Sequence, residues 1–320
     1  MKYVDMHCDT ITALFMKNGR LRENDAHNDL LKMKKGECLL QNFAIFTNLK
    51  DQDSTFTKES IDYYYQQLEI NNDLIRPVYR YQDILDNEKD GLMSAVLTLE
   101  EGSVIDGDLK NLKWFYDKGV RMITLTWNYS NGIGHPNFEY GKHRLDSFHE
   151  PNTTDGLTDF GIEYIRKMDE LGIIIDVSHL SDAGFYDVLK YGSKPFVASH
   201  SNARSICPVV RNLTDDMIKK LSERGGVTGI NFCSAFIEKG NESMTKIDNI
   251  IQHIRHIYKV GGIDCIGLGS DFDGIHNELE FKDSSGMQMI YEKLKQYFSE
   301  DDIEKIFYKN VLRVYKEVIE

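Results

Sequence analysis

The sequence is short of the features that mark secreted, membrane-spanning and nucleic-acid-binding proteins. Its five cysteines are scattered and include no CxxC pair, so a disulfide framework is not expected. No apolar run approaches the length of a transmembrane helix, and the first residues, MKYVDMHCDT, lack the apolar core of a secretory signal. Lys and Arg number 38 against 51 Asp and Glu, a net charge of −13 that argues against a nucleic-acid partner. We therefore expect a cytoplasmic protein that binds neither nucleic acid nor a membrane.

Repeats, low-complexity tracts and flexible linkers are also missing, which favours a single domain over residues 1–320. Short apolar runs alternate instead with amphipathic stretches. Most of these runs are apolar throughout, which is typical of parallel strands that are buried on both faces. The predicted strands are Tyr3–His7, Leu39–Phe46, Met93–Leu99, Arg121–Thr126, Ile173–Val177, Phe196–Ser199, Val227–Phe232 and Cys265–Gly269.

The stretches between the strands predict helices. TDFGIEYIRKMDELG (158–172) has apolar residues near helical spacing, and TDDMIKKLSERGG (214–226) begins with a capping Thr and ends in glycines. Residues 47–91 predict helical insertions, 128–157 an irregular loop, and 286–320 further helices. About eight strand–helix units close a (β/α)8 TIM barrel, so this α/β fold is predicted, with extra helices in long loops and at the C-terminus.

Polar side chains that suit a metal ion follow five of the predicted strands. In such a barrel the chemistry is carried at the carboxyl ends of the strands. A lone histidine there is more often structural, but this set brings several imidazoles and carboxylates to one end of one barrel, which suits zinc and related ions. The residues are His7, Asp9, Glu100, Glu101, Asp176, His179, His200, Asp271 and Asp273.

One ion cannot use all these groups and keep an open coordination position. Two ions about 3.5 Å apart, bridged by a carboxylate and a water, can. Glu100 is central in the strand order and is the expected bridge. His7 and Asp9 would then complete the site of one metal, and His179 and His200 that of the other.

Six stretches between residues 5 and 274 carry most of the chain's polar residues at strand ends: DMHCDT, LTLEEGSVID, GVRMITLTWN, GLTDFGIEYIRKMDELGIIIDVSHLS, ASHSNARSICPVVRNLTDD and IGLGSDFDG. With these stretches in this order, the chain resembles the membrane dipeptidase (renal dipeptidase) family of zinc peptidases, within the amidohydrolase-like barrels. The resemblance implies a binuclear zinc dipeptidase with two Zn²⁺ per chain, dipeptide substrates and a homodimeric assembly. It implies the same five ligands, His7, Asp9, Glu100, His179 and His200.

The resemblance adds two further residues. Arg211 matches the arginine that contacts the substrate carboxylate, and Asp271 matches an acid that shuttles a proton near the metals. The alternative for Arg211 is a surface arginine after a turn. The alternative for Asp271 is a helix cap, a role that Asp273 could fill instead. Glu101 is expected to be only a packed or solvated neighbour of Glu100.

The chain departs from the animal members of the family at two positions. Trp127 stands where they carry a histidine that contacts the substrate near the reacting carbonyl, so Asn128 becomes a candidate substrate contact, with His135 or the metal alone as alternatives. Cys233 stands where they carry an aromatic side chain.

The expected activity is hydrolysis of free dipeptides, including those with a C-terminal D-residue, by a hydroxide that bridges the metals. Glu100 would hold both ions, and Asp271 would act as general base and then as general acid. One alternative keeps the metal site but opens lactams, lactones or other small amides. Another is a non-catalytic metal-binding barrel, against which the intact set of ligands argues.

Overall fold

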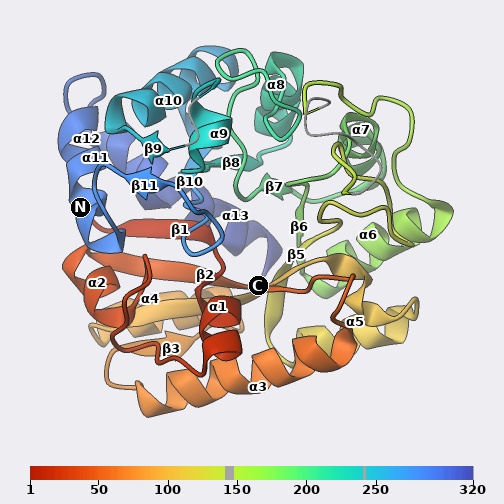
Figure 1. Ribbon diagram of the computed structural model, residues 1–320, viewed down its shortest axis with the longest axis horizontal. Coiled ribbons are helices and arrows are strands. Elements are labelled where there is room, and N and C mark those ends of the chain that lie inside the picture. The colour runs from red at the N-terminus through yellow and green to blue at the C-terminus, as the bar shows by residue number, and fades with distance from the viewer. Residues whose placement is uncertain (141–147, 241–242, 320) are drawn as a thin grey trace.

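Eight parallel strands form a closed ring in the computed structural model of the protein, which describes residues 1–140, 148–240 and 243–319 (Figure 1). The order around the ring is β1, β10, β8, β7, β6, β5, β4 and β2, and the pairing of β2 with β1 closes it. The ring strands are β1 (Tyr3–Cys8), β2 (Cys38–Phe46), β4 (Met93–Glu100), β5 (Val120–Thr124), β6 (Ile174–Asp176), β7 (Val197–Ala198), β8 (Val227–Ile230) and β10 (Ile266–Leu268). The predicted TIM barrel is confirmed.

The helices surround this ring (Figure 1). They are α1 (Thr10–Lys17), α2 (Leu30–Lys35), α3 (Ser54–Ile70), α4 (Tyr81–Lys89), α5 (Leu109–Asp117), α6 (Asp159–Leu171), α7 (Asp182–Tyr191), α8 (Asp215–Glu223), α9 (Ser234–Ile237), α10 (Ile247–Gly261), α11 (Met287–Leu294), α12 (Glu300–Glu304) and α13 (Asn310–Val318), with a π-helical turn over Lys305–Lys309. Two short strands, β9 (Met244–Thr245) and β11 (Glu278–Leu279), pair outside the ring. None of the described helices is both long and apolar enough to cross a bilayer.

The two helices predicted from caps and spacing are present. Thr158 caps α6 by accepting a hydrogen bond from Gly161, and α6 ends at Gly172, whose left-handed backbone suits glycine. Thr214 caps α8 in the same way. The C-terminal tail is helical as expected. The irregular segment 128–157 holds only isolated bridges in its described part, and residues 141–147 of it lie outside the described residues.

The interior of the ring is packed at its amino-terminal end. Val4, Val96, Met122 and Val227 from four different strands meet there in one buried cluster. Helix α13 joins this cluster through Val311, Val314, Tyr315 and Val318 and contacts β8 and β10. With this end filled, the opposite end, where the strands finish, is left for the site.

The sequence prediction missed three strands: the short pair β9 and β11 outside the ring, and β3 beside β4. Segment β3 (Ile75–Pro77) pairs with Met93–Ala95 at the start of β4, whereas β5 pairs with β4 only from Leu97 onward. It lies inside 47–91, which was expected to be helical and does contain α3 and α4. Three residues ending in a proline are too few to show a strand period.

Several ring strands are shorter than predicted at their carboxyl ends. Strand β7 ends at Ala198 rather than Ser199, because the Ser199 N–H donates to the carboxylate of Asp176 and not to the ladder. The backbone here has left the sheet to build the site.

Candidate metal centre and active site

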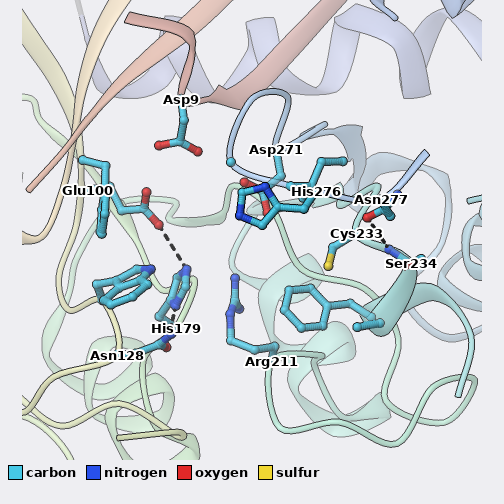
Figure 2. A pocket seen from close by; sticks show the side chains of 16 residues that line it. Asp9, Glu100, Asn128, His179, Arg211, Cys233, Ser234, Asp271, His276 and Asn277 are labelled. Carbon is cyan, nitrogen blue, oxygen red and sulfur yellow. Dashed lines mark hydrogen bonds and ion pairs between the residues drawn. The ribbon is translucent and has the colours of Figure 1, made fainter. Parts of the chain in front are cut away.

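The five expected ligands come from the carboxyl ends of four ring strands and meet at one place. His7 lies in β1 and Asp9 just after it, Glu100 ends β4, and His179 and His200 follow β6 and β7. Figure 2 shows Asp9, Glu100 and His179 around one cavity of about 340 Å³, together with Asp271 and Arg211. All five predicted ligands are buried, with at most 8% of their surface exposed.

Glu100 stands at the centre of this group. Its Oε1 lies 3.1 Å from His179 Nε2 and 3.7 Å from His200 Nε2, while its Oε2 lies 3.5 Å from His7 Nε2. His7 Nε2 is in turn 3.5 Å from Asp9 Oδ2 and 4.0 Å from Asp271 Oδ1. We call His7, Asp9 and Asp271 the carboxylate half of the site and His179 and His200 the imidazole half. Each oxygen of Glu100 faces one half.

The donor atoms of this group fit a metal ion. His7 Nε2 and Asp9 Oδ1 are buried and make no hydrogen bond with any described residue, a state that costs free energy unless another ligand satisfies them. His179 Nδ1 is 2.9 Å from the amide oxygen of Asn128, which only accepts, so the proton of a neutral imidazole sits on Nδ1 and Nε2 is bare. That bare Nε2 lies 3.1 Å from His200 Nε2. Imidazole nitrogens and carboxylates facing one another in this way are a set that divalent zinc accepts.

Gly274 lies directly against the carboxylate half. A Cβ on this residue would overlap Asp9 Oδ2 and lie 2.5 Å from Asp271 Oδ1. The backbone therefore packs directly against the two carboxylates, and only glycine leaves them room.

The chain turns sharply at the strand ends that carry the site. His179 and Asp271 have φ angles of 69° and 62°, in the left-handed region that residues other than glycine rarely adopt. Such backbone is tolerated where the surroundings impose it and is concentrated at functional sites.

The two halves differ in electrostatics. Burial alone would lower the pKa of His7, but the carboxylates of Glu100 and Asp9 raise it well above its usual range. Burial and the charge of Glu100 raise the pKa of Asp9 to about 8. In the imidazole half, burial and the Arg211 charge lower the pKa of His179 to about 4, and burial, helped by His7, lowers that of His200 well below its usual range. Burial and charge therefore favour protons at His7 and Asp9, which a bound cation would displace, and disfavour them at His179 and His200.

Glu100 itself is held ionised. Burial would raise the pKa of this carboxyl, but the neighbouring imidazoles of His7 and His179 lower it below its usual range. It is the anionic centre between the two halves.

Arg211 is buried in the wall of the same cavity and forms no ion pair with any of the described residues. Only 4% of it is exposed, and burial lowers the pKa of its guanidinium. Its Nη1 and Nη2 make long bonds of 3.4 Å to Ser201 Oγ and the His200 carbonyl, and its Nε bonds to none of the described residues. The guanidinium lies 5.3 Å from the ring of Phe236. It is not a surface arginine, and its free donors suit an anion that enters the cavity.

Asp271 and Asp273 have separate tasks. No helix begins at Asp271, so it is not a helix cap; its Oδ2 accepts from Asn231 Nδ2 at 2.9 Å and the side chain lines the cavity. Asp273 accepts from Thr10 Oγ1 at 2.6 Å and from His27 N–H at 2.7 Å, which ties the segment after β10 to the start of α1.

Three further residues singled out from the sequence, Glu101, Asn128 and His135, contact neighbouring groups of the protein. Glu101 is fully buried rather than solvated and accepts from the Trp127 N–H at 3.0 Å, so it holds the segment after β5. Asn128 lines the cavity but its side-chain oxygen faces His179. His135 does not line the cavity, and its ring lies 3.0 Å from Ser130 Oγ.

Of the residues in the far wall of the cavity, only Cys233 was singled out from the sequence. Burial raises the pKa of its thiol to about 12. This wall consists of two short segments, 233–236 at α9 and 274–277 after β10, and includes the imidazole of His276. Neither segment carries a periodic pattern, so no sequence signal marks it; only the packing of two distant loops does.

Known proteins resemble this chain over nearly its whole length. The sequence model of membrane dipeptidase (peptidase family M19) matches residues 1–320. An uncharacterized protein in the pqqA 5′ region of Klebsiella pneumoniae is 34% identical over 271 residues, which cover 81% of this chain and 97% of that protein. An uncharacterized dipeptidase of Schizosaccharomyces pombe is 32% identical over 317 residues, which cover 91% and 72%. A solved metallopeptidase from Rhodobacter sphaeroides, liganded with a phosphinate mimic of the dipeptide L-Ala-D-Ala, has a TM-score of 0.90 at 23% identity and covers 99% of both chains.

Proposed function

Because the chain belongs to the membrane dipeptidase family and is a metal-dependent dipeptidase, we propose that it is a binuclear zinc enzyme for free dipeptides, including those that end in a D-residue. One observation carries the proposal. The Arg211 guanidinium, whose Nε bonds to none of the described residues and whose other two nitrogens make only long bonds, lies in the wall of the cavity into which Glu100, His179 and Asp9 point (Figure 2). A site for an anion thus sits beside a site for cations.

The ligand assignment follows the two halves. His7 and Asp9 would hold one zinc ion, His179 and His200 the second, and Glu100 would contribute to both. When bound, such a pair supplies Lewis acidity and a water whose pKa is lowered toward neutrality.

Arg211 binds and orients the substrate. The free carboxylate of a dipeptide would satisfy its unused donors through two parallel charge-assisted hydrogen bonds. This contact places the peptide bond one residue away from the guanidinium. Together with a carboxylate or metal near the free amine, it would restrict cleavage to short substrates. A buried arginine gains most from a carboxylate that is also out of water.

Asp271 moves the proton. Its Oδ2 is held by Asn231, while its Oδ1 faces His7 and the cavity. From this place Asp271 accepts a proton from the attacking water and passes it to the leaving nitrogen, first as general base and then as general acid.

Tolerance of a D-residue at the second position rests on a relative and on the wall of the cavity. The Rhodobacter sphaeroides protein is liganded with a mimic of L-Ala-D-Ala. In this chain Arg211 reads the carboxylate, and the segments 233–236 and 274–277 line the space around it. The space between these two segments and Arg211 would accept a side chain of either hand at the second position.

The test uses zinc-reconstituted protein with L-Ala-D-Ala, L-Ala-L-Ala and N-acetyl-L-Ala-L-Ala, each with and without a chelator, and measures released alanine. We expect chelator-sensitive cleavage of both free dipeptides, while the acetylated one is spared. Failure to cleave any of them by protein shown to hold two zinc ions would refute the dipeptidase mechanism proposed here and favour a lactam or lactone substrate. Failure to bind zinc would refute the metal site itself.

A further inference from the structure

A buried carboxylate behind the imidazole half has no part in the mechanism above. Asp176 ends β6 and is fully buried. Its Oδ2 accepts from Thr124 Oγ1 and Ser199 Oγ, both at 2.6 Å, and its Oδ1 accepts from the N–H groups of Ser178 at 3.0 Å and Ser199 at 2.8 Å. Four donors and no acceptor surround it, which is the environment of an ionised carboxylate.

The Ser199 hydroxyl connects this carboxylate to a predicted metal ligand. Its oxygen lies 2.8 Å from His200 Nδ1 and 2.6 Å from Asp176 Oδ2. A hydroxyl has one proton, and a carboxylate cannot donate, so that proton goes to Asp176. The bond to His200 must then run the other way, from Nδ1–H to the serine oxygen.

The direction of this bond determines whether the other ring nitrogen of His200, Nε2, carries a proton. A neutral imidazole with its proton on Nδ1 has a bare Nε2. His200 Nε2 is the atom that lies 3.1 Å from His179 Nε2 and 3.7 Å from Glu100 Oε1. Asp176, Ser199 and His200 are at most 1% exposed, so water has no access to replace any link.

Asp176 also holds the second strand end of the imidazole half. It accepts from the N–H of Ser178, the residue before His179, and the Ser178 oxygen accepts from the N–H of His200 at 3.1 Å. One carboxylate therefore joins the turns that present both histidines.

We propose that Asp176 and Ser199 are positioning residues that fix His200 in the tautomer whose Nε2 is free to bind a metal. The link to metal affinity rests on the proposed function. The tautomer does not, because it follows from the hydrogen bonds that Ser199 Oγ makes with Asp176 and His200.

The test compares three isosteric or near-isosteric variants of the full-length protein. Ser199→Ala removes the link to His200. Asp176→Asn replaces an acceptor by an amide that donates to the Ser199 oxygen, which frees the hydroxyl to donate to Nδ1 and reverses the tautomer. Thr124→Val is the matched control, because it removes a bond of the same length to the same oxygen of Asp176 without touching Ser199.

The first readout is the tautomer of His200 in metal-free protein, from long-range ¹H–¹⁵N correlation spectra of ¹⁵N-histidine-labelled samples, assigned by loss of the signal in His200→Gln. We expect Nδ1–H in the wild type and Thr124→Val, and a shift toward Nε2–H in Ser199→Ala and Asp176→Asn. The second readout is zinc affinity by chelator competition. One of the two ions should bind about 10- to 100-fold more weakly in those two variants.

Three results would overturn the proposal: Nε2–H in the wild type, an unchanged tautomer in both Ser199→Ala and Asp176→Asn, or a loss of zinc affinity in Thr124→Val as large as in Ser199→Ala. Should the wild type show the expected tautomer and bind no zinc, the positioning of His200 stands and the proposed function fails. Melting temperatures of all samples identify any variant that does not fold, and either of the two test variants suffices.

Discussion

Each half of the site is supported by a buried aspartate that accepts hydrogen bonds from the N–H and the hydroxyl of one serine. The serine oxygen has a different second partner in each half. In the imidazole half, Asp176 accepts from the N–H and hydroxyl of Ser199 at 2.8 and 2.6 Å. In the carboxylate half, the buried Asp5 accepts from the N–H and hydroxyl of Ser270 at the same two distances. Each pair fastens two neighbouring strand ends. The Ser199 oxygen then reaches an imidazole, whereas the Ser270 oxygen lies 3.1 Å from the carbonyl of His7.

The difference follows from where the charges are. His7 faces the carboxylates of Asp9, Glu100 and Asp271, which attract positive charge to its Nε2 whether a proton or a metal supplies it. His179 and His200 have Glu100 as their shared carboxylate, and burial, together with the nearby Arg211 cation, lowers their pKa values. In the imidazole half, nearby carboxylates contribute less, and hydrogen-bond partners at Nδ1 orient each imidazole instead: Asn128 for His179 and Ser199 for His200.

Glu100→Gln should have the largest effect, because Glu100 faces both halves. A glutamine keeps the volume but removes the anion and one acceptor, so both zinc ions should be lost. The loss of several kcal/mol of charge stabilisation corresponds to a fall of about a thousandfold in kcat/KM. Zinc content and dipeptide turnover measure it.

The matched control is Glu101→Gln. It alters the neighbouring carboxylate, which is also buried but holds Trp127 and Ser103. This variant should be less stable yet retain zinc. Equal loss of zinc in both variants would contradict the central place of Glu100.

Gly274→Ala should damage the carboxylate half alone. The added methyl overlaps the carboxylates of Asp9 and Asp271, so the ion proposed for His7 and Asp9 should bind about 100-fold more weakly while the other proposed ion is retained. Gly132→Ala is the control, since a Cβ there meets no atom within 4 Å. Titration of each protein with zinc should show one weakened site in the first variant only; two weakened sites would mean that the halves are not separable.

Arg211→Met tests the anion site beside the imidazole half. The loss of charge-assisted hydrogen bonds to the substrate, about 2 kcal/mol, should lower kcat/KM for L-Ala-L-Ala about thirtyfold. The C-terminal amide of the same dipeptide lacks the carboxylate and should be cleaved equally by wild type and variant. An equal loss on both substrates would show that Arg211 acts on the ligands and not on the substrate.

His253 should give the smallest effect, on stability and not on chemistry. Its Nδ1 accepts from the Ala203 N–H at 3.1 Å and its Nε2 is 2.9 Å from the Ile237 carbonyl, which fastens the segment that leads to Arg211. Burial lowers its pKa to about 4. Below its unfolded pKa of about 6.5 the unfolded chain therefore binds more protons, and stability falls as the pH is lowered toward 4.

Between pH 7 and pH 5.5 this histidine should cost about 1 kcal/mol of unfolding free energy. His253→Gln removes that share, so the variant should lose less stability than the wild type over the same range in denaturant titrations of metal-free protein. Parallel curves for the two proteins would rule out His253 as the source.

The sequence predicts the barrel and the members of the site far better than their supports. Apolar runs locate the ring strands, and residues such as His7 and Glu100 come directly at their ends, so their meeting follows from the fold. Glu101 accepts a hydrogen bond from Trp127, and Asp273 accepts one from Thr10. Both bonds join segments that are distant in the sequence. No local pattern encodes such partners.

The burial and hydrogen bonding of Arg211 could not be predicted from the sequence for the same reason. Its position in VVRN says that an arginine is present, but only packing shows that it is buried with unused donors. The short strand β3 was missed for a related reason, since three residues become a strand only through β4.

The closure of the ring has a consequence for synthesis of the chain. Strand β1 pairs with β10 through Asp5 and Leu268, and α13 packs into the buried cluster that contains Val4. At about 5–20 residues per second, a growing chain exposes β1 for tens of seconds before these partners leave the ribosome. His7 and Asp9 are therefore made long before Asp271 and α13, and the metal pocket proposed here can reach full affinity only after that later segment has emerged and packed.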